Sequence, residues 1–263
     1  MPDNISIIIP ILNEAKTIGS LIEYLSENST AGNVAEIIVV DGGSTDDSPK
    51  IVSKFINDDP LSESYFDLNS DVLVLEKATE THLKINTEVL LIKSEKGRAK
   101  QLNAGARLAS GQILYFLHAD SFPPKNYDSL IIEEVNNGNR AGCFRMQFDS
   151  SHWWLRLASW LTKFSWRACR GGDQSQYITR ELFDEIGGYD ETYIIYEDNV
   201  LINELYARKE FTVIDAKLRT SARMYKKYGV WKVQFHFFVI YIKKWFGASA
   251  DELFKYYKRT IGS

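Results

Sequence analysis

Two kinds of segment alternate along the first half of the chain: short apolar runs, and longer stretches with apolar residues at helical spacing. The apolar runs predict buried strands at 5–10, 36–41, 88–93 and 113–117. The longer stretches predict helices that begin after Asn13, at Ser48 and at Arg98. Strands and helices in this order predict an α/β fold with a mostly parallel sheet flanked by helices.

The second half mixes shorter elements with aromatic-rich stretches. Its alternating and apolar runs predict strands at 142–148, 175–179 and 211–215. Its helical spacing predicts helices at 153–166, at 180–186, from 197 onward and across 229–258 as a C-terminal extension. The polar segment 57–87 fits neither pattern, and we expect an excursion at the sheet edge with one candidate strand at 72–76.

A carboxylate stands at the carboxyl end of each of two predicted strands: Asp41 is the last residue of 36–41, and Asp120 comes shortly after 113–117. Ligands of open α/β sheets bind at the carboxyl ends of strands. A hard cation such as Mg²⁺ is commonly held by one or two carboxylates together with substrate phosphates. Asp120 therefore predicts a metal–diphosphate site, although an aspartate at either position is also ordinary turn chemistry.

Composition narrows the class of protein. The 263 residues include 44% hydrophobic ones, which suits one domain with a sizeable core, and the net charge of −4 predicts no general attraction to nucleic acid. Cys143 and Cys169 have neither pair nor metal-ligand spacing, so we expect free thiols in a reducing compartment. The N-terminus predicts no signal peptide, and 230–246 is short and charged for a membrane span, so we expect a cytoplasmic protein.

Six motifs stand in a characteristic order over residues 5–225: IPILNE at 9–14, VVDGGSTD at 39–46, GRAKQLNAGA at 97–106, HAD at 118–120, GDQ at 172–174 and ED at 197–198. Together they resemble family 2 glycosyltransferases of the GT-A fold, in particular small bacterial enzymes with the pattern GRAxQxNxGA…HAD. The resemblance implies hexosyl transfer from a nucleoside diphosphate sugar. It divides the chain into a nucleotide-binding half at 1–124, an acceptor and catalytic half at 140–225 and C-terminal helices at 226–263.

The resemblance also implies roles for individual residues. For the sugar donor, the residues that would line the site for base, ribose and diphosphate are Pro10, Asn13, Glu14, Asp41, Asp46 and Arg98. Asp120 matches the metal-binding position, for Mn²⁺ or Mg²⁺, with His118 as a second candidate ligand. Asp198 matches the catalytic base, and the residues expected at the acceptor pocket or in support are Asp173, Gln174 and Glu197.

One position departs from the family pattern, because His118 stands where an aspartate is common. A histidine cannot give the acceptor-only contact that a carboxylate gives to a ribose hydroxyl. A weak metal ligand, a hydrogen-bond partner and a packing residue all remain open for it.

The chemistry of sugar transfer needs two separate carboxylates. Negative charge grows on the departing diphosphate, which a metal ion stabilises as a Lewis acid. The acceptor hydroxyl becomes a good nucleophile only when a positioned carboxylate takes its proton. We expect Asp120 and Asp198 to divide these tasks, and a single in-line displacement would invert the anomeric carbon.

Two other functions remain open as alternatives. A nucleotidyltransferase would need a glycine-rich loop after its first strand, and 10–14 contains no glycine. A non-catalytic sugar-nucleotide-binding protein would keep the fold and is compatible with the His118 departure.

Aromatic residues gather in two helical segments, at 153–166 and 231–245. Such residues are commonly core or interface residues, but Trp and Tyr also favour the boundary between apolar and polar media. Attachment to the inner face of a membrane, with a lipid-linked or membrane-proximal acceptor, is therefore the alternative to a wholly soluble protein.

Overall fold

The computed structural model describes residues 4–56, 73–74, 87–171 and 174–262. The strands are β1 (Ile5–Ile11), β2 (Val34–Asp41), β3 (Leu73–Val74), β4 (Glu88–Lys93), β5 (Ile113–Phe116), β6 (Ser121–Phe122), β7 (Ala141–Phe148), β8 (Gln176–Thr179) and β9 (Thr212–Thr220). The helices are α1 (Ile18–Glu27), α2 (Ser48–Ser53), α3 (Arg98–Leu108), α4 (Tyr127–Asn136), α5 (Trp153–Leu161), α6 (Arg180–Ile186), α7 (Glu197–Arg208), α8 (Arg223–Tyr228), α9 (Val230–Trp245) and α10 (Ala250–Thr260). A 3₁₀ turn, η1 (Arg167–Cys169), follows α5.

The strands form one sheet in the order β3-β4-β2-β1-β5-β8-β7-β9-β6. The neighbours β4, β2, β1 and β5 are parallel, as are β7 and β9, while β3, β6 and β8 pair antiparallel with their neighbours. The chain moves outward from β1 to β2 and β4, and then returns to place β5 on the other side of β1. The crevice between the carboxyl ends of β1 and β5 is therefore a topological switch point, where open α/β sheets bind ligands.

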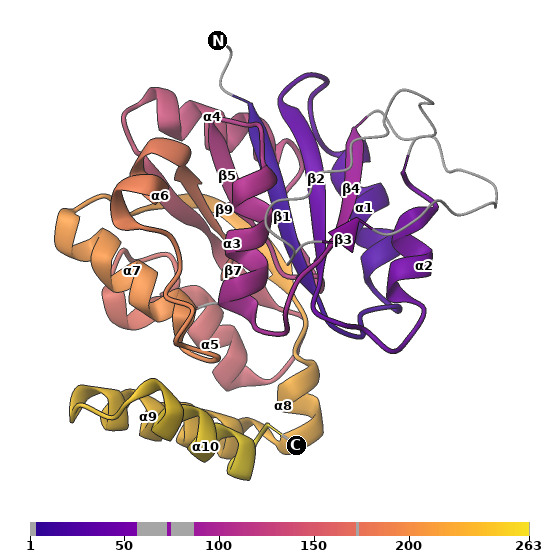
Figure 1. The fold of residues 1–263 in the computed structure, drawn as a ribbon. Coiled ribbons are helices and arrows are strands. Elements are labelled where there is room, and N and C mark those ends of the chain that lie inside the picture. Colours follow the sequence, from indigo (N-terminus) through magenta and orange to yellow (C-terminus); the bar gives the residue numbers. More distant parts are fainter. Residues whose placement is uncertain (1–3, 57–72, 75–86, 172–173, 263) are drawn as a thin grey trace.

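Helices cover both faces of this sheet (Figure 1). One core lies under α1, α2 and α4, and contains alternate β1 residues such as Ile7 and Ile9. The other core lies under α3, α6 and α7, and contains Ile8 of the same strand. A Cβ on Gly105 would lie 2.5 Å from Ile8 Cγ2, so the glycine lets α3 lie directly against the sheet.

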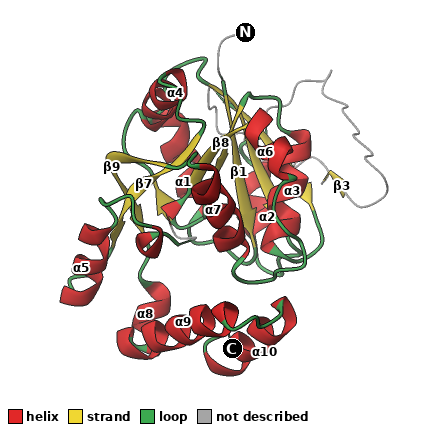
Figure 2. Ribbon diagram, turned by 90° about the vertical axis from the view of Figure 1, so that its left-hand side faces the viewer, coloured by secondary structure: helices red, strands yellow, loops and turns green. Residues whose placement is uncertain are grey.

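The last three helices form a separate layer beside the α/β body, which Figures 1 and 2 both show below it. A third, smaller core joins this layer to α5 and the end of β7, through Phe148, Leu155, Tyr225 and Val233. No helix in the described part of the chain is long and apolar enough to cross a membrane.

The predicted α/β fold with a mostly parallel sheet, flanking helices and a C-terminal helical extension is confirmed. The antiparallel β8, inserted between β5 and β7, makes the sheet mixed. The sequence analysis missed α4, which buries Tyr127 and Ile131, and it placed the end of β9 five residues too early. Of the candidate strand at 72–76, Leu73 and Val74 pair with β4; most of 57–87 lies outside the described residues.

Candidate active site

A pocket lies at the switch point between β1 and β5. Its walls include Pro10 near the end of β1, His118 just after β5, Asp198 in the first turn of α7, and Tyr189. Three of the residues singled out in the sequence thus meet here, although 188 positions separate the first from the last. The pocket therefore lies between the parallel strands β1 and β5 and the helix α7, which carries the predicted base Asp198.

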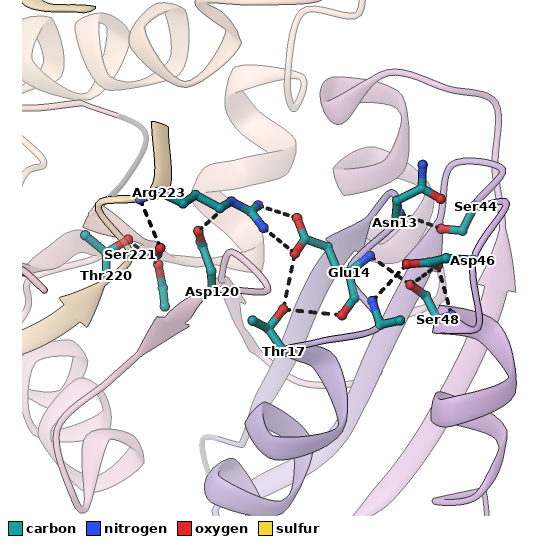
Figure 3. A network of polar contacts seen from close by, with 12 residues as sticks. Asn13, Glu14, Thr17, Ser44, Asp46, Ser48, Asp120, Thr220, Ser221 and Arg223 are labelled. Carbon is teal, nitrogen blue, oxygen red and sulfur yellow. Dashed lines mark hydrogen bonds and ion pairs between the residues drawn. The ribbon is translucent and has the colours of Figure 1, made fainter. Parts of the chain in front are cut away.

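The loops that follow β1 and β2 are bonded to each other. The backbone N–H of Asn13, which has a left-handed φ of 60°, donates to Ser44 Oγ at 2.9 Å, and Asn13 Oδ1 accepts from the Thr45 N–H at 2.8 Å. Asp41 Oδ1 accepts from the Ser44 N–H at 2.9 Å. Asp46 Oδ2 accepts from the Ala15 N–H at 3.1 Å (Figure 3). These predicted sugar-donor residues therefore hold the two loops in place.

Two further side chains stabilise this loop pair: Asp46 carries a negative charge, and Gln101 forms hydrogen bonds to the backbone. A hydrogen bond from the Ser48 hydroxyl, followed by backbone N–H donors, lowers the pKa of Asp46, which stays ionised at neutral pH. The buried Gln101 donates from Nε2 to the carbonyl oxygens of Ile11 at 2.9 Å and Val40 at 2.8 Å. Sequence reasoning missed Gln101, and its place in the GRAKQ motif is the signal that could have found it.

The first arginine cluster consists of Arg98, Glu197 and Asp198. Arg98 Nη1 lies 3.2 Å from Glu197 Oε1 and 3.4 Å from Asp198 Oδ2, which joins the start of α3 to the start of α7. Glu197 is 1% exposed, and Asp198 keeps slightly more exposure on the wall of the pocket. Burial, and then the neighbouring charge of Asp198, raise the pKa of Glu197 to about 7, although Arg98 opposes the shift.

The second arginine cluster consists of Arg223, Glu14 and Asp120 (Figure 3). Arg223 binds Glu14 through both terminal nitrogens, with Nη1 at 2.8 Å from Oε2, and its Nε lies 3.4 Å from Asp120 Oδ2. The side chains of the two carboxylates are largely buried, whereas Arg223 is more than half exposed. Sequence reasoning missed Arg223, although one signal could have found it: a cation in the first turn of a helix opposes the helix dipole.

The two clusters lie close enough to influence each other. The hydrogen bonds to Glu14 raise the pKa of Arg223, with the charge of Asp120 acting in the same direction, while the charge of Arg98 opposes the rise. Each cluster contains one arginine and two carboxylates. The edge of the sheet between β1 and β5 thus carries both excess negative charge and two guanidinium groups.

Gln174 lies in the interior, behind the wall of the pocket. It is 2% exposed, donates from Nε2 to the Cys169 carbonyl at 2.9 Å and accepts from Arg170 Nη1 at 3.0 Å. The residues that follow it, Ser175 and Gln176, line the pocket, so Gln174 supports the wall from behind. Asp173 lies outside the described residues.

The donor set for a divalent cation is small. The described residues contain no group of three or more histidine, cysteine, aspartate and glutamate side chains arranged to hold a metal. Asp120 offers one partly exposed carboxylate, and His118 is half-buried on the pocket wall. One carboxylate fits Mg²⁺ or Mn²⁺ when the substrate phosphates supply further oxygen ligands, and Arg223 now lies where such a cation would compensate Asp120.

An α/β sheet with its site at this switch point and acidic residues on both sides has the GT-A architecture. The model of the Glycosyl transferase family 2 matches residues 6–69 and 70–246. The chain therefore belongs to this family of glycosyltransferases.

Individual relatives are distant. Glycosyltransferase AglE of Haloferax volcanii is 27% identical over 123 residues, which are 47% of this chain and 32% of the relative, so the chain spans about a third of that protein. The mannosyltransferase PcManGT from Pyrobaculum calidifontis, solved with GDP-Man and Mn²⁺, superposes with a TM-score of 0.64 at 17% identity over 96% of this chain and 67% of the other. S. aureus TarS 1-349 in complex with UDP-GlcNAc gives 0.58 at 16% identity, over 83% and 58%. At these identities the solved structures establish the fold alone.

Proposed function

We propose that the chain transfers a sugar from a nucleoside diphosphate sugar to an acceptor hydroxyl, with inversion at the anomeric carbon. The observation that carries the proposal is the pair of arginine–carboxylate clusters at one switch point, with Asp120 in one and Asp198 in the other. Family membership supports the reaction class, and the nucleotide sugars bound to the structural relatives support the class of sugar donor.

Asp198 acts as the base in this proposal. It lines the pocket, whereas Glu197 beside it is sealed from solvent, so an acceptor can reach only Asp198. The proton passes from the acceptor hydroxyl to the Asp198 carboxylate as the oxygen attacks the anomeric carbon. Arg98 pairs with Asp198 and orients it, and Glu197, with its raised pKa, limits how much negative charge the cluster carries.

The second cluster serves the leaving group. A divalent cation at Asp120 would supply Lewis-acid stabilisation of the diphosphate. Arg223 brings a second positive charge to the same place, and its planar fork suits phosphate oxygens as well as the Glu14 carboxylate it now binds. The loop residues Pro10, Asn13, Asp41 and Asp46 shape the adjoining site for base and ribose in this proposal.

A screen of nucleotides tests the proposal directly. UDP and GDP, each with and without Mn²⁺, should raise the melting temperature selectively, since a ligand that binds only the folded state stabilises it. Candidate nucleotide sugars are then followed for release of the nucleoside diphosphate. Stabilisation without any release across the sugars would favour the non-catalytic binding protein, and selective stabilisation by nucleoside triphosphates would favour the nucleotidyltransferase.

We propose further that the acceptor is lipid-linked or membrane-proximal and that the chain is peripheral to a membrane. The support is the exposed aromatic character of α5, which lies within the expected catalytic half, and of α9, which follows it.

A further inference from the structure

Helix α9 carries aromatic residues on the side that faces away from its own core. Its buried residues are Val233 and Ile240. Its most exposed aromatic residues are Trp231, Phe235, Phe238 and Trp245, which are between 56% and 84% exposed. At 100° per residue these four lie within a narrow stripe opposite the buried pair. The helix is therefore apolar on both faces, and only one face is covered.

Helix α5 repeats the arrangement at the same spacing. Trp153, Leu157 and Trp160 are 39% to 61% exposed, while Leu155 is buried. The two stripes meet where the rings of Trp153 and Trp231 lie 5.9 Å apart. We call the exposed residues of both helices, Trp153, Leu157, Trp160, Trp231, Phe235, Phe238 and Trp245, the aromatic face. The neighbouring α10 exposes Asp251, Glu252, Lys255 and Lys258 instead, so the aromatic face is particular to α5 and α9.

Charge is distributed very unevenly around the aromatic face. Segments 150–170 and 221–262 together hold 13 of the 31 lysines and arginines but only 2 of the 35 aspartates and glutamates. The chain as a whole carries −4, so these segments are strongly basic on an otherwise acidic protein. Lys232 and Lys243 are exposed on α9 itself, and Lys163 Nζ lies 4.6 Å from the centre of the Trp160 ring. Long basic side chains beside exposed aromatic rings suit an interface between headgroups and acyl chains.

We propose that the aromatic face binds an anionic lipid bilayer surface, with its aromatic rings in the headgroup region and its basic side chains against lipid phosphates. Charge complementarity favours this occupant over a second copy of the chain, because two copies would bring two strongly basic surfaces together. Basic residues near an anionic leaflet are attracted to its negative surface potential.

Helix α9 is linked to both arginine clusters. Tyr241 of α9 donates to Asn199 Oδ1 at 3.3 Å, and Asn199 follows Asp198 in α7. Arg223 opens α8, which packs against α9. A bilayer at the aromatic face would therefore lie beside the helix that carries the base. That consequence, unlike bilayer binding itself, rests on the proposed function of sugar transfer with Asp198 as the base.

Flotation with vesicles tests the proposal. The full chain is floated with phosphatidylcholine vesicles and with vesicles that also contain phosphatidylglycerol. We expect binding only to the anionic vesicles, weakened by high salt. Phe235→Ser/Phe238→Ser and Lys232→Glu/Lys243→Glu should each lower the bound fraction at least about tenfold. The control Lys16→Glu/Lys50→Glu makes the same change in net charge near α1 and on α2, and it should bind like the unaltered chain.

Three outcomes would overturn the proposal. Equal binding to neutral and anionic vesicles would remove the electrostatic part, and equal loss in the control pair would show that net charge matters rather than this face. No flotation at all, with a dimer in light scattering that Phe235→Ser/Phe238→Ser dissociates, would assign the face to a second copy. Calorimetry of UDP or GDP binding to the same variants separates membrane binding from sugar transfer: intact nucleotide binding without flotation overturns membrane binding and leaves sugar transfer standing.

Discussion

The two arginine clusters have the same composition but different surroundings. Arg98 pairs with Glu197 and Asp198 where one carboxylate is sealed from solvent, whereas Arg223 pairs with Glu14 and Asp120 from a side chain that is 57% exposed. Burial raises the pKa of Glu197 to about 7. In the open cluster, hydrogen bonds to Glu14 and the charge of Asp120 raise the pKa of Arg223.

This difference shows how burial assigns different tasks to similar groups. A buried cluster resists full ionisation, so it can hold and pass a proton near neutral pH. Solvent weakens an ion pair whose arginine is more than half exposed, so a cation or a diphosphate can replace it at little cost. We therefore assign proton transfer to the Arg98 cluster and binding of the leaving group to the Arg223 cluster.

The largest expected effect comes from Asp198→Asn. The asparagine amide cannot take the proton from the hydroxyl group of the acceptor, so turnover should fall by about 10²–10⁴-fold. UDP or GDP binding should stay within a few-fold of the unaltered chain. Steady-state release of nucleoside diphosphate and calorimetry measure the two quantities. Asp184→Asn, on the exposed side of α6, is the matched control and should change neither. Retained turnover in Asp198→Asn would remove the base from this cluster.

Asp120→Ala tests the open cluster. It deletes the carboxylate proposed to hold the cation, so the gain in UDP or GDP affinity that Mn²⁺ gives should disappear. We expect about a hundredfold weaker binding with Mn²⁺ present and little change without it, measured by calorimetry. Asp184→Ala, which removes an exposed carboxylate on α6, is the control and should leave the Mn²⁺ effect unchanged. An unchanged Mn²⁺ effect in Asp120→Ala would contradict the assignment.

The local spacing of apolar residues predicted most of the strands and helices that position these two clusters. Buried runs such as 36–41 are strands because their apolar side chains cover both faces of a parallel sheet, and Asp41 and Asp120 follow from where such runs end. The ion pairs within the two arginine clusters could not be predicted from the sequence. Arg98 meets α7 about 100 positions away and Arg223 meets Glu14 209 positions away, and no periodicity encodes contacts at that separation.

The aromatic segments illustrate the same limit. Trp153 and Trp154 are adjacent and identical, yet Trp153 is largely exposed while Trp154 packs against the small core beside Leu155. Neighbouring residues of a helix point in directions about 100° apart, so only one of the two rings can face the sheet. Which one does so depends on how α5 packs against β7. The sequence could therefore propose a lipid-facing helix without saying which side chains would face the lipid.

Glu197→Gln tests the buried cluster through stability. The folded-state pKa of Glu197 lies above the unfolded one, so the native state binds more protons between about pH 4.5 and 7 and loses stability as the pH rises through that window. Glutamine does not titrate. The unfolding free energy of Glu197→Gln relative to the unaltered chain should therefore rise from about pH 5 to pH 8, by on the order of 1–3 kcal/mol.

Urea unfolding at pH 5 and pH 8 measures this change. The loss of the ion pair with Arg98 is taken as the same at both pH values, so it cancels in the difference. Glu252→Gln is the control, because hydrogen bonds at the start of α10 lower the pKa of that exposed carboxyl and place its titration below this window. Its difference from the unaltered chain should be flat. The same flat result for Glu197→Gln would mean that Glu197 is ionised in the fold like an ordinary carboxylate, and the contrast between the clusters would disappear.

Arg223→Gln should have the smallest effect. The guanidinium is exposed and its pairs are weak, so its loss removes one charge-assisted contact to the diphosphate, about a tenfold weakening of UDP or GDP binding by calorimetry. Arg223→Lys should retain part of the nucleotide affinity, because lysine keeps the positive charge but lacks the planar guanidinium group. Removing Arg223 also leaves Asp120 without this cation, so Mn²⁺ alone should bind more tightly, a readout independent of turnover. If Mn²⁺ affinity were unchanged and nucleotide affinity rose, Arg223 would be a blocking group rather than part of the binding site.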